Sequence, residues 1–322
     1  MELPQIDPIA DPSGYLGIIR NPDGSITRTL KLPECPASSD GAVLSKDIPI
    51  NKETNTWARV YLPRRPESSA APATKLPLLI YYHGGGFILG SAAASFIHKF
   101  CCEIASEIPA VVVSVEYRLA PEHRLPAAYD DCMEALEWVG TTGEEWLTDS
   151  ADFSKCFLMG TSAGGNIAYH VGLRAVTCVD RLMPVKIQGL ILHHPYFGGV
   201  ERTPSEVRLA NDKVFPPCVA DVMWDLGLPI GVDRDHEYSN PMTTERSHDF
   251  EKLRDQGWRV LVTGCDGDPM VDRQIGLVKM LKEKGVDAVG EFSKGGFHGV
   301  EHFDDSKAKI LYSVVKNFVL SL

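Results

Sequence analysis

A serine flanked by small residues is the first candidate for chemistry, in Gly160-Thr161-Ser162-Ala163-Gly164. The short apolar segment 155–160 precedes it and an amphipathic segment, 163–178, follows it, so the pattern predicts a tight turn between a strand and a helix. Such a turn leaves no room for side chains beside the serine, whose hydroxyl is exposed at strained backbone angles. The first N–H groups of the helix, that of Ala163 among them, would face negative charge forming beside Ser162. We therefore expect Ser162 to be a nucleophile.

An activated serine needs a histidine base. Of the ten histidines, only His298 and His302 follow the last predicted parallel strand. His298 lies in the glycine-rich loop 295–299, which would let its ring reach the carboxyl edge of the sheet. His302 is nearer the last helix and is expected at the surface. We therefore assign the base to His298.

The base needs an acid that orients it, and three aspartates follow the strand expected at 258–264. Asp266 is close to the strand end, and Asp272 is a turn into the next helix. Asp268 lies between them, followed by a proline. The sequence Asp-Pro also suits the start of a helix, with the aspartate as N-cap. Of the three we favour Asp268 as the catalytic acid.

The donors for an oxyanion are expected in an earlier loop after a strand. His83-Gly84-Gly85-Gly86 directly follows the apolar segment 76–82 and precedes Phe87. Glycines leave their N–H groups unshielded, so two of Gly84, Gly85 and Gly86, together with Ala163, would hold the oxyanion; which two remains open. A nucleotide-binding phosphate loop is excluded because no Gly-Lys-Ser/Thr follows.

Other side chains are candidates for metal binding or for substrate contact. His193 and His194 are adjacent at the end of the strand expected at 187–193, and adjacent strand residues face opposite sides. They should therefore not bind one ion, and no metal is predicted. The candidate walls of an apolar substrate pocket are Phe87, Ile88, His194, Phe197, Val214 and Trp224.

Composition excludes several classes of partner. The 322 residues carry a net charge of −11 without a basic run, which argues against nucleic acids and anionic membranes. No apolar run is long enough to span a membrane, and the first residues, rich in acids and prolines, do not resemble a signal peptide. The eight cysteines are dispersed without a Cys-x-x-Cys pattern. We expect a cytoplasmic protein with a small-molecule substrate; its oligomeric state is not readable.

The elements that must position these residues alternate along the chain. Two strands, at 43–48 and 57–62, come first, and a surface loop rich in proline and alanine follows at 63–75. Six apolar strands are then expected at 76–82, 110–116, 155–160, 187–193, 258–264 and 288–293. Helices are expected at about 91–107, 127–139, 163–178, 271–285 and 305–320. This order predicts an α/β fold in one domain, 1–322: a mostly parallel sheet of about eight strands with helices on both faces.

Two segments depart from this alternation. Residues 1 to about 40 form an excursion ahead of the sheet, with a turn at Asn21-Pro22-Asp23-Gly24. Residues 195–250 are too long for an ordinary loop, and we expect a functional role such as a lid. In the stretch 117–123, Arg118 and Glu122 are expected to form buried ion pairs at a structural turn.

Four motifs together resemble the hormone-sensitive-lipase-like group of α/β hydrolases, and within it the plant carboxylesterases, kin of the gibberellin receptors. They are 83–87 (His-Gly-Gly-Gly-Phe), 117–123 (Tyr-Arg-Leu-Ala-Pro-Glu-His), 160–166 (Gly-Thr-Ser-Ala-Gly-Gly-Asn) and 268–272 (Asp-Pro-Met-Val-Asp). The resemblance covers nearly the whole chain. It implies the α/β-hydrolase fold, a cap formed by about 1–40 and 197–247, and hydrolysis of carboxylic esters without a cofactor. It also implies a catalytic triad matching Ser162, Asp268 and His298.

Departures from the family pattern are small. Thr161 stands where relatives often have Asp or Glu, and His298 is present where the gibberellin receptors lose the histidine. The leading hypothesis is a serine carboxylesterase for small, fairly apolar esters. A ligand receptor on a hydrolase scaffold is one alternative. A dehydratase or cyclase of plant specialised metabolites is another, because it would use nearly the same residues.

Overall fold

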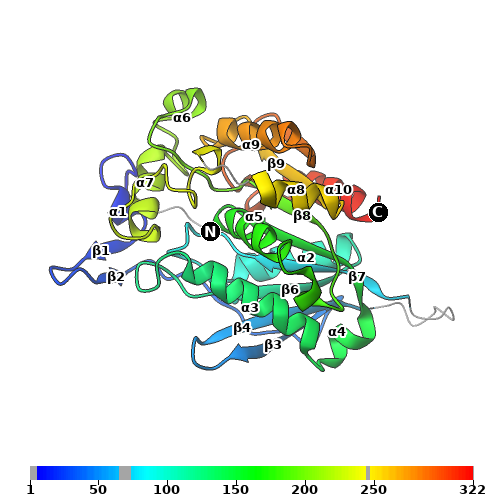
Figure 1. The fold of residues 1–322 in the computed structure, drawn as a ribbon. Helices are drawn as coiled ribbons and strands as arrows, with labels where there is room; N and C mark the ends of the chain where they lie inside the picture. The colour runs from blue at the N-terminus through cyan, green and yellow to red at the C-terminus, as the bar shows by residue number, and fades with distance from the viewer. Residues whose placement is uncertain (1–5, 65–73, 244–246, 322) are drawn as a thin grey trace.

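The computed structural model describes residues 6–64, 74–243 and 247–321. Residues 65–73 of the loop predicted at 63–75 lie outside these ranges. An eight-stranded sheet has the order β10-β9-β8-β7-β5-β6-β4-β3. Its strands β5 to β10 are parallel, whereas β4 runs antiparallel to both β3 and β6. The predicted mostly parallel sheet of eight strands is confirmed (Figure 1).

The boundaries of the sheet strands lie close to the predicted ones. The strands are β3 (Val43–Asn51), β4 (Thr56–Pro63), β5 (Leu76–Tyr82), β6 (Val111–Glu116), β7 (Ala151–Thr161), β8 (Ile187–His193), β9 (Arg259–Cys265) and β10 (Asp287–Ser293). The helices packed on the sheet or following it are α2 (Ser95–Glu107), α3 (Ala127–Thr141), α4 (Glu145–Ser150), α5 (Ala163–Ala175), α8 (Ser247–Asp255), α9 (Val271–Glu283) and α10 (Asp305–Leu320). Within the described ranges, no helix has both the length and the apolar character that spanning a membrane requires.

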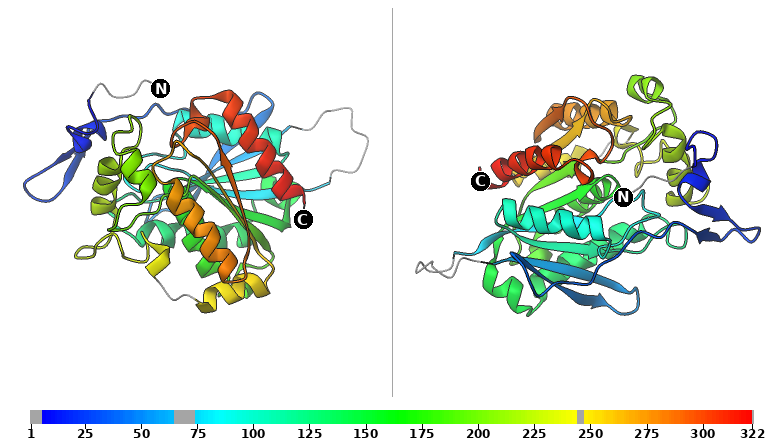
Figure 2. Two further views of the ribbon diagram at one scale, coloured as in Figure 1. Left: turned by 90° about the horizontal axis from the view of Figure 1, so that it is seen from above. Right: turned by 180° about the vertical axis from the view of Figure 1, so that it is seen from behind.

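The sheet separates two hydrophobic cores because successive strand residues face opposite sides. Leu78 and Ile80 of β5 belong to the core shared with α3, α5 and α9. Leu79 and Tyr81 of the same strand belong to the core shared with α2 and α10. Helices therefore cover both faces, and the carboxyl ends of the parallel strands meet at one edge (Figures 1 and 2).

Of the helices that pack on the sheet or follow it, two were not predicted and one begins later than predicted. The short α4 and the helix α8 escape the periodicity argument because their apolar residues are few; in α8 the buried ones are Phe250 and Leu253. Helix α2 begins at Ser95 rather than near residue 91. The preceding residues form a turn, with the Ala94 N–H donating to the Ser91 carbonyl.

The N-terminal excursion contains the short helix α1 (Pro12–Tyr15) and a hairpin of β1 (Ile18–Arg20) and β2 (Ile26–Arg28). Two further helices, α6 (Pro204–Arg208) and α7 (Pro217–Gly227), lie in the long segment between β8 and β9. Helix α1 packs against α7, and the views from above and from behind both show the blue N-terminal elements beside it (Figure 2). Segments far apart in the sequence therefore meet near the sheet's carboxyl edge.

The ion pairs expected in 117–123 differ from each other. Arg118 pairs with Asp131, whose side chain is buried, as predicted. Glu122 pairs instead with Arg28 of the N-terminal hairpin, and about half of its side chain is exposed. The prediction of a buried pair at Glu122 is wrong, because its partner comes from a surface hairpin. Arg28 also donates to the carbonyl of Ile88, so it ties the hairpin to the loop that follows β5.

Candidate active site

Ser162 lies between the last residue of β7 and the first residue of α5, with φ +57° and ψ −119°. The residues two positions before and after it must be glycines: a Cβ on Gly160 would lie 2.0 Å from the carbonyl oxygen of Gly164. A Cβ on Gly164 would lie 1.9 Å from the carbonyl oxygen of Tyr82. The sequence therefore folds here as the tight turn that the motif predicts, and it holds a residue at an angle rare for side chains larger than glycine.

A chain of hydrogen bonds joins Ser162, His298 and Asp268, which come from three different strand ends. His298 Nε2 is 2.8 Å from Ser162 Oγ, and its Nδ1 is 2.8 Å from Asp268 Oδ2. With Nδ1 protonated, His298 donates to the carboxylate and its Nε2 accepts from the serine hydroxyl. Ser162 is 9% exposed and Asp268 is fully buried. This arrangement can take a proton from the serine while the histidine stays oriented.

The environment of Asp268 keeps it ionised. Burial alone would raise its pKa, but the charge of His298 and hydrogen bonds from His194 and His298 outweigh burial and lower the pKa far below its usual range. The Met270 N–H and the Gln274 amide also donate to this carboxylate. Asp268 is therefore an acceptor on every side.

The two other aspartates considered as the acid have partners elsewhere. Asp266 accepts a hydrogen bond from the N–H of Gly295. Asp272 accepts one from the N–H of Ser205 in α6. Each thus supports a neighbouring loop, and of the three only Asp268 bonds to His298.

The glycine loop after β5 lies directly beside the serine. A Cβ on Gly84 would be 3.3 Å from Ser162 Cβ, and Gly85 and Gly86 have φ values of +121° and +61°. Among the residues that the structure describes, no acceptor is bonded to the N–H of Gly85 or Gly86. The N–H of Ala163, in the first turn of α5, also has no partner within the helix. These groups are free to bind an anion next to Ser162.

His83 contacts this glycine loop and makes no hydrogen bond to Ser162 among the described residues. Its ring stacks on Tyr117 with centroids 4.3 Å apart, and the Tyr117 hydroxyl donates to the His83 carbonyl. Its Nδ1 is 2.8 Å from the Gly84 carbonyl oxygen. Burial lowers the pKa of His83 to about 4, so the ring is neutral at pH 7.

Phe215 is a site residue that sequence reasoning missed. Its ring stacks on His298, with centroids 4.4 Å apart and an angle of 20° between the planes. The pocket residue predicted from the sequence is its neighbour Val214, whose carbonyl accepts a hydrogen bond from the hydroxyl of Tyr15. The segment before α7 has no periodicity, so no sequence signal distinguishes position 215 from 214.

The other pocket candidates are mostly buried. Phe87, Ile88, Phe197 and Trp224 are each 1% exposed or less. Phe87 packs against Tyr129, Tyr196 and Trp224 in one aromatic cluster. Because Phe87 directly follows Gly86, this cluster anchors the end of the glycine loop.

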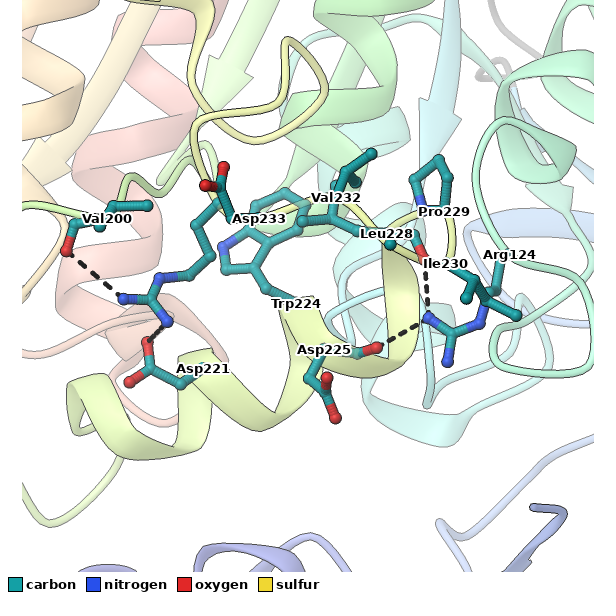
Figure 3. A pocket seen from close by; sticks show the side chains of 12 residues that line it. Arg124, Val200, Asp221, Trp224, Asp225, Leu228, Pro229, Ile230, Val232 and Asp233 are labelled. Atoms are coloured by element: carbon teal, nitrogen blue, oxygen red, sulfur yellow. Dashed lines mark hydrogen bonds and ion pairs between the residues drawn. The ribbon is translucent and has the colours of Figure 1, made fainter. Parts of the chain in front are cut away.

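Trp224 also lines an open cavity of about 450 Å³ between α7 and the segment 228–234 (Figure 3). The charged side chains there are paired or bonded to backbone. Arg234 pairs with Asp221, and Arg124 donates to the carbonyls of Asp225 and Leu228. Among the described residues that line this cavity, none belongs to the hydrogen-bonded set of Ser162. The cavity is separate from the candidate catalytic centre.

His194 does not line a pocket, because it is fully buried and its Nδ1 is 2.7 Å from Asp268 Oδ2. His193 and His194 do not face opposite sides, so that prediction is wrong. Strand β8 ends at His193, and His194 has φ +44°, so the alternation stops there. Both Nε2 atoms approach the same oxygen of Glu301, at 3.1 and 3.3 Å.

His302, predicted at the surface, is half-buried. Its ring packs edge-on against Phe96 and Phe100 of α2, because a short 3₁₀ turn, η3 (Val300–His302), folds it back over the sheet edge. Burial lowers the pKa of His302 to about 3, so this ring is neutral. It makes no hydrogen bond to Ser162 or Asp268 among the contacts that the structure describes.

Comparison with known proteins identifies the fold and the family of the chain. A family model described as the alpha/beta hydrolase fold matches residues 79–302. Carboxylesterase 20 of Arabidopsis thaliana is 53% identical over 98% of both chains. A 3-O-acetylpapaveroxine carboxylesterase of Papaver somniferum is 46% identical over 97% of this chain and 98% of its own.

Among solved structures, an esterase of Pyrobaculum calidifontis superposes with a TM-score of 0.70 at 28% identity, covering 89% of this chain and 86% of that one. A thermostable carboxylesterase from a metagenomic library has the same TM-score at 25% identity, covering 91% and 90%. The likeness thus extends over nearly the whole chain in both sequence and fold. On these grounds the chain belongs to the plant carboxylesterase family of α/β hydrolases, as its motifs predict.

Proposed function

We propose that this carboxylic ester hydrolase is a serine esterase in which Ser162 is the nucleophile, His298 the base and Asp268 the residue that orients the base. The observation that carries the proposal is the pair of 2.8 Å hydrogen bonds joining the three side chains. Ser162 Oγ attacks the ester carbonyl carbon while its proton passes to His298 Nε2. The carbonyl oxygen becomes an oxyanion, which accepts from Ala163 N–H and from two of the glycine N–H groups.

The intermediate collapses when the carbon–oxygen bond to the alcohol breaks. His298 gives its proton to the departing alkoxide, and an acyl group remains on Ser162. A water molecule then donates a proton to His298 and attacks the acyl carbon. The second oxyanion collapses with return of the proton to Ser162, releasing the carboxylic acid. No cofactor takes part in these steps.

The substrates we propose are small, fairly apolar esters. Supporting this, Phe215 covers one face of His298, and Met223 of α7 lies against Gly86, where it would be 2.1 Å from an added Cβ. Apolar side chains thus border the reacting atoms on the side of the long segment. One relative is named as a carboxylesterase of an O-acetyl compound, 3-O-acetylpapaveroxine. Acetyl esters are therefore a reasonable first test.

We also propose that about 1–40 and 197–247 together form a cap; residues 1–5 and 244–246 lie outside the described residues. Two contacts support it beside the packing of α1 on α7. The Tyr15 hydroxyl donates to the Val214 carbonyl, and Cys218 Sγ lies 3.4 Å from the Pro8 carbonyl oxygen. The N-terminal segment is therefore attached to the residues that adjoin His298.

The test is hydrolysis of p-nitrophenyl acetate and butyrate by the wild type and by Ser162→Ala. We expect the variant to lose on the order of 10³-fold or more in kcat. In parallel, a fluorophosphonate probe should label the wild type at Ser162 and leave the variant unlabelled. Turnover retained by Ser162→Ala would place the nucleophile elsewhere. An unlabelled, inactive wild type would favour a ligand receptor, and a labelled wild type that eliminates rather than hydrolyses would favour a lyase.

A further inference from the structure

His194 lies between two carboxylates at the end of β8. Its Nδ1 is 2.7 Å from Asp268 Oδ2, and its Nε2 is 3.3 Å from Glu301 Oε2. His194 and Asp268 are fully buried, and Glu301 is 9% exposed. The Nδ1 contact is a hydrogen bond, whereas the Nε2 contact has the distance of an ion pair without the alignment of a hydrogen bond. A protonated ring is attracted to both carboxylates, and a neutral ring would lack that attraction. The geometry thus favours an imidazolium held between two acids.

The same carboxylate oxygen of Asp268 is hydrogen-bonded to both His194 and His298. The two Nδ1 atoms are 2.7 and 2.8 Å from Asp268 Oδ2, and the two rings meet at 70° with centroids 5.3 Å apart. We propose that His194 is a positioning residue of the catalytic centre, which fixes the Asp268 carboxylate for His298 and is itself fixed by Glu301. The inference rests on the proposed function and adds to it a residue that does not touch the reacting atoms.

The backbone of His194 supports this role. Its φ of +44° lies in the left-handed region, which is unfavourable for a residue with a Cβ. The backbone is held there by its N–H, which donates to the carbonyl of Thr263 in β9. This conformation ends the alternation of β8 and directs the ring toward Asp268 rather than into one of the two cores. Strain of this kind persists where the surrounding contacts over-determine it.

Several titratable groups face His194. Burial disfavours a charge on it, but the hydrogen bond to Asp268 and the negative charges of Asp268 and Glu301 outweigh burial and raise the pKa of His194 to about 9. Burial lowers the pKa values of His193 and His302, so both rings are neutral.

One further titratable group, Cys265, completes this environment. Burial raises the pKa of Cys265 to about 12, so it is a thiol. The fixed charges are thus two carboxylates and one imidazolium, and their net charge is −1. The imidazolium formed at His298 during the reaction neutralises this charge, so no isolated charge remains buried.

The experiment compares His194→Ala, which removes the donor, with His194→Asn, which keeps a neutral donor near the place of Nδ1. Asparagine also tolerates the left-handed backbone. We expect kcat for p-nitrophenyl butyrate to fall roughly 10- to 100-fold in His194→Ala, the range seen when supporting hydrogen bonds around a site are lost. KM should change little because His194 is buried behind Asp268. His194→Asn should recover most of kcat.

The pH profile separates positioning from a general structural role. In His194→Asn the acid limb of kcat/KM should move to higher pH, since the neutral side chain no longer opposes the positive charge on His298. The control is His98→Asn, which changes a partly buried histidine bonded to Arg59, away from Asp268. It should leave the limb in place. If His194→Ala does not fold, Glu301→Gln carries the test and should lower kcat several-fold.

Wild-type kcat in folded His194→Ala, or in Glu301→Gln, would overturn the inference. So would stoichiometric zinc retained after dialysis against a chelator, because His193, His194 and Glu301 would then be metal ligands. The Ser162→Ala and probe results are independent of these variants. A labelled wild type with an unaffected His194→Ala would therefore refute only the positioning role, whereas an unlabelled wild type would refute the proposed function.

Discussion

The ring of Phe215 stacks on the imidazole of His298, with centroids 4.4 Å apart and planes inclined by 20°. The first residue belongs to the segment between β8 and β9, and the second to the loop after β10. A phenyl face is attracted to a cation, so it favours the imidazolium that forms when Ser162 loses its proton. It also limits the rotation of the histidine ring. The proposed cap thereby contacts the proposed base directly.

We expect Phe215→Leu to lower kcat/KM for p-nitrophenyl butyrate roughly 2- to 10-fold, matching the about 0.5–1.5 kcal/mol that an aromatic pair contributes beyond its buried area. Leucine preserves most of the apolar volume, so the variant should fold. Steady-state kinetics and circular dichroism check this. The control is Phe157→Leu, which removes a ring that packs against Phe318 on the other side of the molecule. A larger loss of activity in the control would argue against a specific role for Phe215.

Tyr15 supports the same segment through its hydrogen bond to the Val214 carbonyl, at 3.0 Å. We expect Tyr15→Phe to cost about 1 kcal/mol of stability, the usual contribution of one hydrogen bond. It should also change the ratio of kcat/KM between short and long p-nitrophenyl esters, because the residues beside His298 gain freedom.

The matched control is Tyr312→Phe, which loses a hydrogen bond to Glu103 on the opposite face of the sheet. It should lower stability by a similar amount and leave the chain-length ratio unchanged. Equal ratios in wild type and Tyr15→Phe would mean that the N-terminal segment does not influence substrate choice.

Gly86 has φ +61°, and a Cβ there would lie 2.1 Å from the sulfur of Met223. We expect Gly86→Ala to shift the loop and withdraw an N–H from the oxyanion, with a loss of roughly 10²- to 10³-fold in kcat. The control is Gly231→Ala, at φ +90° with no heavy atom within 4 Å of the added Cβ. Both variants carry backbone strain, but only Gly86→Ala should lose activity. Comparable kcat values in the two variants would exclude Gly86 as a donor.

The sequence allowed the sheet and the order of the site residues to be predicted, because both depend on local pattern. Near-continuous apolar strands alternate with amphipathic helices, and Ser162, Asp268 and His298 each follow a strand at the same edge. The roles of Phe215 and His194 could not be predicted this way. Phe215 lies in an irregular segment. The direction of the His194 side chain depends on a positive φ, which the residue pattern of β8 does not predict.

Glu116 offers a test of stability against pH. Burial raises its pKa to about 7, although the Ala92 N–H donates to it and favours the ionised form. As pH rises, the unfolded chain, in which the pKa of this carboxyl is near 4.5, releases the proton at a lower pH than the folded state does. Stability due to this group is present below about pH 4.5 and is lost as pH rises through about 7.

We therefore expect Glu116→Gln, relative to wild type, to gain more in melting temperature at pH 8 than at pH 5. Thermal unfolding followed by circular dichroism measures this. Glu53→Gln, at an exposed position in the turn between β3 and β4, is the control and should follow the wild type at both pH values. If the melting temperatures of Glu116→Gln and wild type differed by the same amount at both pH values, ionisation of Glu116 would not destabilise the folded state.

His194 makes the opposite kind of contribution, because its folded pKa of about 9 exceeds the ordinary value of 6.5. The folded state binds the proton more tightly, so the stabilisation is fully present below about pH 6.5 and is lost as pH rises through about 9. A rise of this size corresponds to about 3 kcal/mol at most, at about 1.4 kcal/mol per pKa unit. The difference in unfolding free energy between wild type and His194→Asn should therefore be largest near pH 6 and shrink by pH 10. Urea unfolding at pH 6, 8 and 10 measures it, with His98→Asn as the reference for losing a histidine elsewhere. A difference that stayed constant over this range would show that His194 is neutral in the folded protein, and that it holds Asp268 by a single hydrogen bond and not by its charge.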